Sequence, residues 1–158
     1  DDSNSSYVHR LLTKVDPATP YSLVVVQLST NDASKNKPLG EISDGFERSD
    51  FDTHTVTGAI ESIIAYVRET WGCPVVFYTG SRYDSDAYAA MAERLIALQE
   101  KWGIGVLNLW SDGAFNAISD ADRALYMYDN IHPTKAGYRE WWCPELEKQL
   151  LAYLNSDR

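Results

Sequence analysis

Two short runs of apolar, largely β-branched residues, separated by a stretch with helical periodicity, constrain the fold of this sequence most strongly. The runs Ser22–Leu28 and Pro74–Thr79 are apolar on both faces, which is typical of parallel strands buried between two layers. Between them, apolar residues recur at helical spacing from Val56 to Trp71, and Gly72 follows as a stop signal. The pattern predicts a strand, a crossover helix and a second, parallel strand.

The alternation continues toward the carboxyl terminus. A second amphipathic segment ends at Gly103, and a weaker strand candidate follows at Gly105–Leu109. A last helix is predicted after Pro133, with an interruption at Pro144 because proline removes a helical hydrogen bond. This order predicts an α/β fold, a three-layer αβα sandwich with a parallel sheet, as a single domain over residues 1–158. Ligands of such sheets bind beyond the carboxyl ends of the strands.

Charge and composition exclude several classes of protein. Fourteen basic against 23 acidic residues give a net charge of -9, which argues against a nucleic-acid partner. Apolar runs such as Leu23–Val26 are far too short for a membrane span. The cysteines, Cys73 and Cys143, form no metal-binding motif and leave the compartment open, with the cytoplasm slightly favoured over secretion. We expect neither a metal nor a cofactor.

Two polar clusters carry residue types suited to catalysis. In Asp129-Asn-Ile-His132, the carboxylate is placed to accept a hydrogen bond from Nδ1–H of the imidazole, which leaves Nε2 as a general base. The structural alternative is a surface histidine beside an aspartate that caps the next helix. In Ser29-Thr-Asn31-Asp32, directly after the first strand, the amide of Asn31 is placed to donate to an oxyanion, although the same residues also suit a simple turn.

Together, the two clusters resemble those of the SGNH (GDSL-type) hydrolase superfamily, which includes lipases, esterases and carbohydrate deacetylases. The first is similar to the family's G-x-N-D motif, with Ser29 in place of glycine, and the second matches its D-x-x-H motif. The resemblance runs through the whole chain and implies a flavodoxin-like sandwich. It also implies that His132 is the base, Asp129 its orienting acid and Asn31 an oxyanion donor, acting on a small-molecule or carbohydrate ester.

One family feature is missing, because the sequence contains no G-D-S segment to supply the nucleophilic serine. The simplest interpretation is that the chain is the carboxyl-terminal portion of a hydrolase whose amino-terminal strands and serine lie in an upstream segment or a separate chain. The strand Ser22–Leu28 would then have an exposed edge or a neighbour from another chain. The alternative is a non-catalytic α/β ligand-binding or interaction module of the same fold.

Residues that follow the strands are further candidates for substrate contacts. Ser29 and Ser81 both lie where a strand ends, although loop serines are more often turn or cap residues. Tyr83 belongs to a group of aromatic residues near strand ends, and aromatic faces can stack on sugar rings. The other members of this group are Trp110, Tyr126 and Tyr128.

Overall fold

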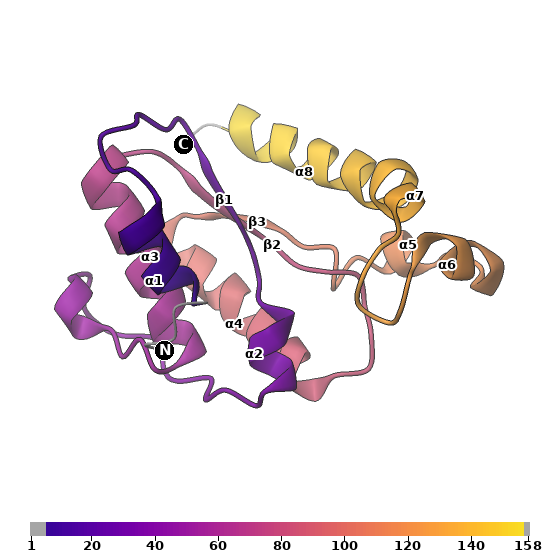
Figure 1. Cartoon of the computed structure of the whole chain (residues 1–158), viewed down its shortest axis with the longest axis horizontal. Coiled ribbons are helices and arrows are strands. Elements are labelled where there is room, and N and C mark those ends of the chain that lie inside the picture. The colour runs from indigo at the N-terminus through magenta and orange to yellow at the C-terminus, as the bar shows by residue number, and fades with distance from the viewer. Residues whose placement is uncertain (1–5, 157–158) are drawn as a thin grey trace.

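A three-stranded parallel sheet forms the centre of the molecule in the computed structural model, which describes residues 6–156 (Figure 1). The strands β1 (Val24–Gln27), β2 (Val75–Tyr78) and β3 (Gly105–Leu107) pair in that order. In the register of the sheet, Val26 lies opposite Phe77 and Phe77 lies opposite Val106. All three predicted strands are present, and each is shorter than its apolar run.

Two long crossover helices, α3 (Val56–Trp71) and α4 (Asp86–Trp102), connect the strands. Each helix follows an N-cap residue whose side chain accepts a backbone hydrogen bond. Each ends at a glycine in the left-handed backbone conformation, which other residues rarely adopt. These residues are Thr55 and Gly72 for α3, and Ser85 and Gly103 for α4. Because both right-handed crossovers move to the next strand in the same direction, the two helices lie on one face of the sheet (Figure 1).

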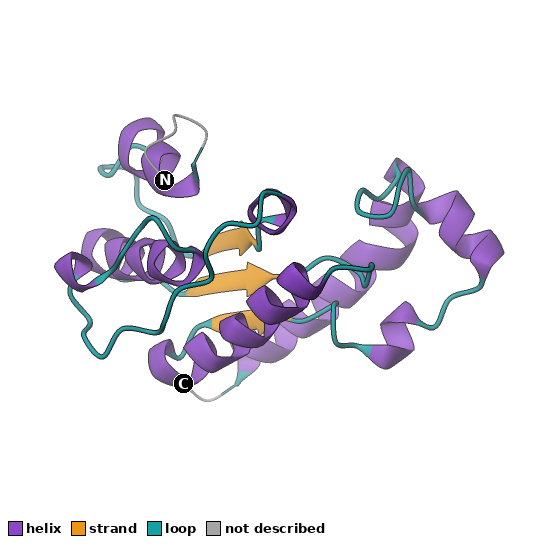
Figure 2. Ribbon diagram, turned by 90° about the horizontal axis from the view of Figure 1, so that it is seen from below, coloured by secondary structure: helices purple, strands orange, loops and turns teal. Residues whose placement is uncertain are grey.

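The opposite face is covered by the carboxyl-terminal helix α8 (Cys143–Asn155), which completes the third layer (Figures 1 and 2). The short helix α7 (Lys135–Gly137) and a π-helical stretch, η2 (Tyr138–Trp142), precede α8, so the predicted interruption near Pro144 is present. The helix comes very close to the sheet, since a Cβ atom on Gly105 would lie 3.0 Å from the ring of Tyr153.

Short helices fill the polar segments between these elements. α1 packs against α3, while α2 and the 3-10 turn η1 lie within the long polar segment after β1. α5 and α6 follow β3 and lead into the loop that contains Asp129. Their bounds are α1 Tyr7–Lys14, α2 Thr30–Ser34, η1 Arg48–Asp50, α5 Gly113–Asn116 and α6 Asp120–Tyr126.

The buried apolar residues form two separate clusters. The larger cluster fills the space between the sheet and helices α3 and α4, and Ile64, Phe77 and Leu95 are among its most buried members. The smaller cluster lies under α5, α6 and the start of the last helix. It consists of Leu109, Phe115, Met127, Trp141 and Trp142.

A buried ion pair fastens the irregular loop between α2 and α3 to the helices. Glu61 of α3 is fully buried, and its carboxylate accepts hydrogen bonds from Nζ of Lys101 (2.6 Å), Nε1 of Trp102 (3.0 Å) and the backbone N–H of Ser43 (3.0 Å). The ammonium of Lys101 also donates to the carbonyl of Gly45 at 2.6 Å. Each buried charge therefore has several partners, as a charge removed from water requires.

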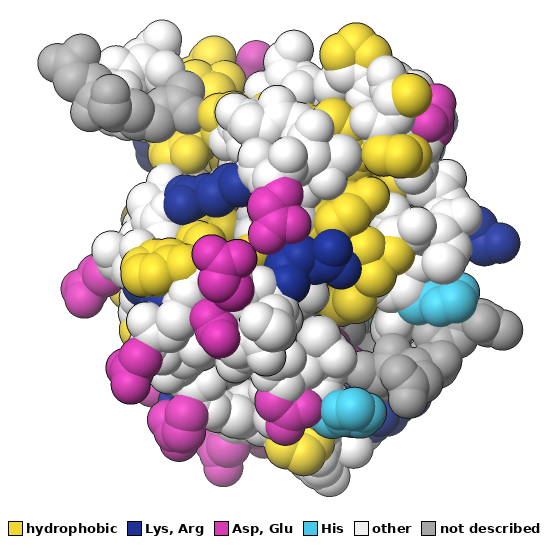
Figure 3. Space-filling view, turned by 90° about the vertical axis from the view of Figure 1, so that its left-hand side faces the viewer, with side chains coloured by type: hydrophobic (Ala, Val, Ile, Leu, Met, Phe, Trp, Pro, Cys, Tyr) yellow, Lys and Arg dark blue, Asp and Glu magenta, His cyan; other side chains and the backbone are white. Residues whose placement is uncertain are grey.

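The surface reflects the acidic composition. On the face shown in Figure 3, acidic side chains are spread widely, with hydrophobic side chains exposed between them. Within residues 6–156, no helix is both long and apolar enough to cross a membrane. Cys73 is buried, Cys143 is exposed, and both are free thiols.

Candidate active site

Backbone pairing joins the two ends of the loop that contains Asp129 and His132. Met127 and Pro133 form an antiparallel bridge, and the N–H of Tyr128 donates to the carbonyl of His132 at 2.8 Å. The chain then enters α7, whose N-cap Thr134 accepts a hydrogen bond from the N–H of Gly137 at 3.0 Å. The loop thus has a defined conformation although it lies at the surface.

Asp129 orients the imidazole of His132. Nδ1 of His132 lies 2.8 Å from Oδ2 and 3.0 Å from Oδ1 of Asp129, as the spacing of the two residues predicted. Oδ1 also accepts the backbone N–H groups of His132 (2.7 Å) and Ile131 (2.8 Å). These backbone donors, followed by the imidazole, lower the pKa of Asp129 to about 2. Asp129 is therefore ionised at neutral pH, and with Nδ1 engaged, Nε2 of His132 is the nitrogen left to exchange a proton.

Asn31 lies in the first turn of α2, immediately after β1. Ser29 is the N-cap of this helix, and its hydroxyl accepts the N–H of Asp32 at 3.3 Å. Leu28, the residue before Ser29, is held by the buried hydroxyl of Tyr88. This hydroxyl donates to the carbonyl of Leu28 (3.3 Å) and accepts the N–H of Gly80 (3.0 Å). Burial raises the pKa of Tyr88, so this donor keeps its proton.

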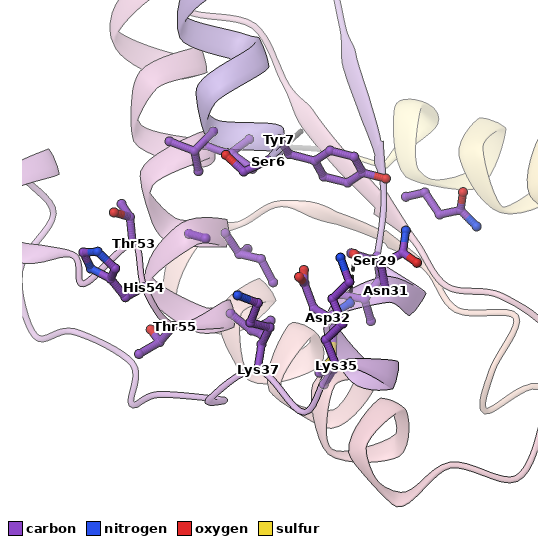
Figure 4. A pocket seen from close by; sticks show the side chains of 18 of the residues that line it. Ser6, Tyr7, Ser29, Asn31, Asp32, Lys35, Lys37, Thr53, His54 and Thr55 are labelled. Carbon is purple, nitrogen blue, oxygen red and sulfur yellow. Dashed lines mark hydrogen bonds between the residues drawn. The ribbon is translucent and has the colours of Figure 1, made fainter. Parts of the chain in front are cut away.

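Ser29 and Asn31 line a cavity of about 250 Å³ between β1 and helices α1, α2 and α3 (Figure 4). Neither Asp129 nor His132 belongs to its lining. The structure therefore brings the predicted base and its acid together, while it places the predicted oxyanion donor in a separate hollow.

A second Asp–His pair, which the sequence reasoning missed, lies at the rim of this cavity. Nδ1 of His54 is 3.1 Å from Oδ1 of Asp52, and the same oxygen accepts the backbone N–H of His54 at 3.0 Å. The backbone hydrogen bond, followed by the ring, lowers the pKa of Asp52. The available signal was an aspartate two residues before one of only three histidines, but no family motif accompanies it.

The remaining candidates occupy different environments. Tyr83 lines an open depression together with Asp129, and Arg82 and Arg123 belong to the same lining. Ser81 is only 2% exposed, and its hydroxyl has no hydrogen-bond partner among the described residues. Ser81 lines neither hollow, so its role in substrate binding stays a prediction.

The side chain of Asn116 fixes the loop that carries Tyr83. Its amide nitrogen donates to the carbonyls of Leu109 and Asp112, both at 2.7 Å, and its amide oxygen accepts the N–H of Arg82 at 2.8 Å. One residue of α5 thereby joins the segments that follow β2 and β3. Within the described part of the chain, no three His, Cys, Asp or Glu side chains are grouped as ligands for a metal ion.

The structure is that of an α/β protein, with a parallel sheet between helix layers and a histidine held by an aspartate in the loop before the final helix. The chain belongs to the GDSL-like lipase/acylhydrolase family, whose model matches residues 2–140, and thus to the SGNH hydrolase superfamily that its motifs resemble. A comparison with curated proteins found no match.

Solved structures show the same fold. A protein from Lactobacillus plantarum is 22% identical, with a TM-score of 0.71, over 98% of this chain and 74% of its own. A candidate GDSL-like lipase from Bacteroides ovatus is 16% identical (TM-score 0.62) over 98% of this chain and 61% of its own. A candidate lipase from Chitinophaga pinensis is 14% identical (TM-score 0.68) over 93% of this chain and 77% of its own. These likenesses support the α/β architecture.

Proposed function

We propose that this hydrolase cleaves short acyl esters, with acetylated carbohydrates among its candidate substrates, by a Ser-His-Asp mechanism. His132 is the general base, Asp129 orients it, and Asn31 donates to the oxyanion. The observation that carries the proposal is the hydrogen bond from Nδ1 of His132 to Oδ2 of Asp129 at 2.8 Å. An imidazole held in this way presents Nε2 to a reacting hydroxyl, which is the geometry that serine activation requires.

The proposed reaction has two steps. In the first, the serine oxygen attacks the ester carbonyl while Nε2 of His132 takes the hydroxyl proton, and the amide of Asn31 donates to the negative oxygen of the tetrahedral intermediate. His132 then returns the proton to the leaving alcohol, which gives an acyl-enzyme. In the second step, water attacks the acyl-enzyme with His132 again as base, and the carboxylic acid and the serine are released.

We propose that the nucleophilic serine is supplied by a segment outside these 158 residues. The described part of the chain leaves room for it, because β1 pairs only with β2, and Val25 on this strand is 47% exposed. The unpaired edge expected for the first strand is therefore present. A parallel strand added to this edge would end beside Ser29 and Asn31, since the carboxyl ends of parallel strands meet at one edge of the sheet.

The alcohol part of the ester is proposed to lie in the depression shared by Tyr83 and Asp129. Arginine and carboxylate side chains around Tyr83 suit a hydroxylated alcohol better than a long aliphatic one. Among the other aromatic candidates, Tyr128 is exposed, whereas Trp110 is buried and unavailable for stacking. Ser29 and Ser81 stay in the proposal as substrate contacts from the ends of β1 and β2.

A second candidate function is a non-catalytic ligand-binding module of the same fold. Its support is that His132 does not belong to the lining of the cavity that contains Asn31. In that case Asp129 would serve only to fix the loop before α7.

Covalent labelling and turnover of the protein joined to its upstream segment distinguish the two functions. With a fluorophosphonate probe and p-nitrophenyl acetate, we expect labelling and hydrolysis that fall by about 10³-fold or more in His132→Ala, because the base is lost. Asn31→Ala should lower kcat by about 10²–10³-fold, the usual effect of removing one oxyanion donor.

The matched control is His54→Ala, which removes the other histidine held by an aspartate. This variant should keep its activity within about twofold. The 158-residue chain without a partner should hydrolyse p-nitrophenyl acetate no faster than buffer. An unlabelled complete protein, or equal losses in the two histidine variants, would refute the esterase assignment.

A further inference from the structure

The hydrogen-bond ladder between β1 and β2 changes at its carboxyl end. Leu28 donates its N–H to the carbonyl of Tyr78 at 2.8 Å. In a parallel pair, the carbonyl of such a residue accepts its next hydrogen bond two residues further along the partner strand, which here is the N–H of Gly80. The hydroxyl of Tyr88 lies between these two groups instead, because it accepts from Gly80 (3.0 Å) and donates to Leu28 (3.3 Å). The bridge therefore takes the place of the last direct hydrogen bond of the ladder.

The side chain of Tyr88 is fixed by its surroundings. Tyr88 is fully buried, and it is the third residue of α4, whose N-cap Ser85 accepts its backbone N–H at 3.1 Å. Its ring lies against those of Tyr83 and Trp110, with centroid distances of 5.3 and 4.9 Å. Because the position is closed to bulk water, the two backbone groups that the hydroxyl joins depend on it for their hydrogen bonds.

The strand end that Tyr88 holds leads directly into α2. Leu28 is followed by the N-cap Ser29, and Asn31 lies in the first turn of the helix. α2 also packs against α4, the helix that carries Tyr88 (Figure 1). A change in the spacing between the ends of β1 and β2 would therefore move the start of α2, and the amide of Asn31 with it.

We propose that Tyr88 is a positioning residue, whose hydroxyl sets the spacing between the ends of β1 and β2 and thereby the place of the Asn31 amide. This inference rests on the proposed function, in which that amide donates to the oxyanion. Tyr88 itself touches no substrate, and its effect reaches the reaction through Asn31. Small displacements matter here, because an error of about 1 Å in a catalytic group can lower a rate about 10²-fold.

NMR couplings across hydrogen bonds test the bridge in the unmodified 158-residue chain, without any activity. We expect a coupling between the amide nitrogen of Leu28 and the carbonyl carbon of Tyr78. We expect none between the amide nitrogen of Gly80 and the carbonyl carbon of Leu28, because the oxygen of Tyr88 intervenes. A direct coupling in the second pair would refute the bridge.

Tyr88→Phe removes the bridging oxygen and keeps the ring. In this variant the backbone amide signals of residues 29–32 and the side-chain amide signals of Asn31 should shift, whereas those of residues 24 and 75, at the other end of the strands, should not. The matched control is Tyr66→Phe, which removes a phenol oxygen from α3, outside both hollows, and should leave residues 29–32 unchanged. Circular dichroism and thermal melting verify that both variants are folded.

Turnover by the protein joined to its upstream segment tests the consequence for catalysis. With p-nitrophenyl acetate, Tyr88→Phe should lower kcat about tenfold and leave KM within about twofold, because the oxyanion donor is displaced and not lost. In the Asn31→Ala background the same substitution should change kcat by less than about twofold, because the group through which Tyr88 acts is gone. Tyr66→Phe should keep kcat within about twofold in both backgrounds.

Three further outcomes would overturn the proposal. They are unchanged signals of residues 29–32 in Tyr88→Phe, an unchanged kcat in that variant, and an equal loss of kcat in the two backgrounds, which a merely structural role would give. The NMR measurements need no activity. A complete protein that the fluorophosphonate probe does not label would therefore refute the esterase assignment, while the NMR measurements alone would decide whether Tyr88 places Asn31.

Discussion

At the scale of single residues, the low pKa of Asp129 comes mainly from the backbone. Its carboxylate accepts the backbone N–H groups of His132 and Ile131, and these two hydrogen bonds lower the pKa more than the imidazole does. The resulting pKa of about 2 lies below the ordinary value of 3.8. Because the folded-state pKa is depressed, ionised Asp129 favours the folded state above about pH 3.8. This contribution disappears as the pH falls toward 2.

An NMR titration of the side-chain carboxyl carbon of Asp129 checks this origin. In the unmodified protein we expect a midpoint near pH 2. His132→Ala should raise the midpoint only part of the way to 3.8, because the variant keeps both backbone donors. A midpoint near 3.8 in the unmodified protein would contradict the backbone origin of the shift.

The contact between Asp129 and His132 was predictable because the two residues are close in sequence. A three-residue spacing is enough to bring the carboxylate of Asp129 to the ring of His132. The pair Asp52 and His54 is just as local, but a two-residue spacing in a polar loop carries no distinctive pattern. The burial of Ser81 depends on packing between distant elements, and a strand-end position does not reveal it.

At the scale of elements, α5 links the segments that follow β2 and β3 through the hydrogen bonds of Asn116. Asn116→Ala would leave the carbonyl of Leu109 and the N–H of Arg82 without their present partner, while the carbonyl of Asp112 would keep its hydrogen bond from the backbone N–H of residue 116. Unpaired polar groups of this kind cost about 1–3 kcal/mol, so we expect the free energy of unfolding to fall by roughly that amount.

Urea denaturation monitored by tryptophan fluorescence measures this loss. Asn155→Ala, at the exposed end of α8, is the control and should stay within about 0.5 kcal/mol of the unmodified protein. Equal stabilities for the two variants would show that α5 does not fasten these segments.

The long elements followed directly from periodicity and capping signals. α3 and α4 end at the predicted glycines, and β1, β2 and β3 lie within their apolar runs. The short helices α2 and α5 were not predicted, because four or five residues provide too little of a helical repeat. They depend instead on the caps Ser29 and Asp112 and on contacts with neighbouring segments.

At the scale of the whole molecule, the parallel sheet was predictable from the alternation of strands and helices. The open edge of β1 was predictable because the sequence lacks the G-D-S segment and the strands that precede it in the family. The absence of His132 from the lining of the cavity that contains Asn31 was not predictable. Asn31 follows a strand that packs against the larger cluster, whereas the loop of His132 follows Met127 of the smaller cluster. A sequence motif indicates which residues act together chemically, but it does not give the relative positions of the elements that carry them.

The division into two clusters implies that the molecule can open in stages. The smaller cluster has five buried members, so its opening should require less free energy than unfolding of the sheet. In hydrogen–deuterium exchange, amides of residues 127–142 should exchange at least tenfold faster than those of β2, and equal protection would contradict this. On heating, the loop of Asp129 and His132 would then unfold while the sheet is still folded. Loss of activity should therefore occur at a lower temperature than unfolding of the whole protein.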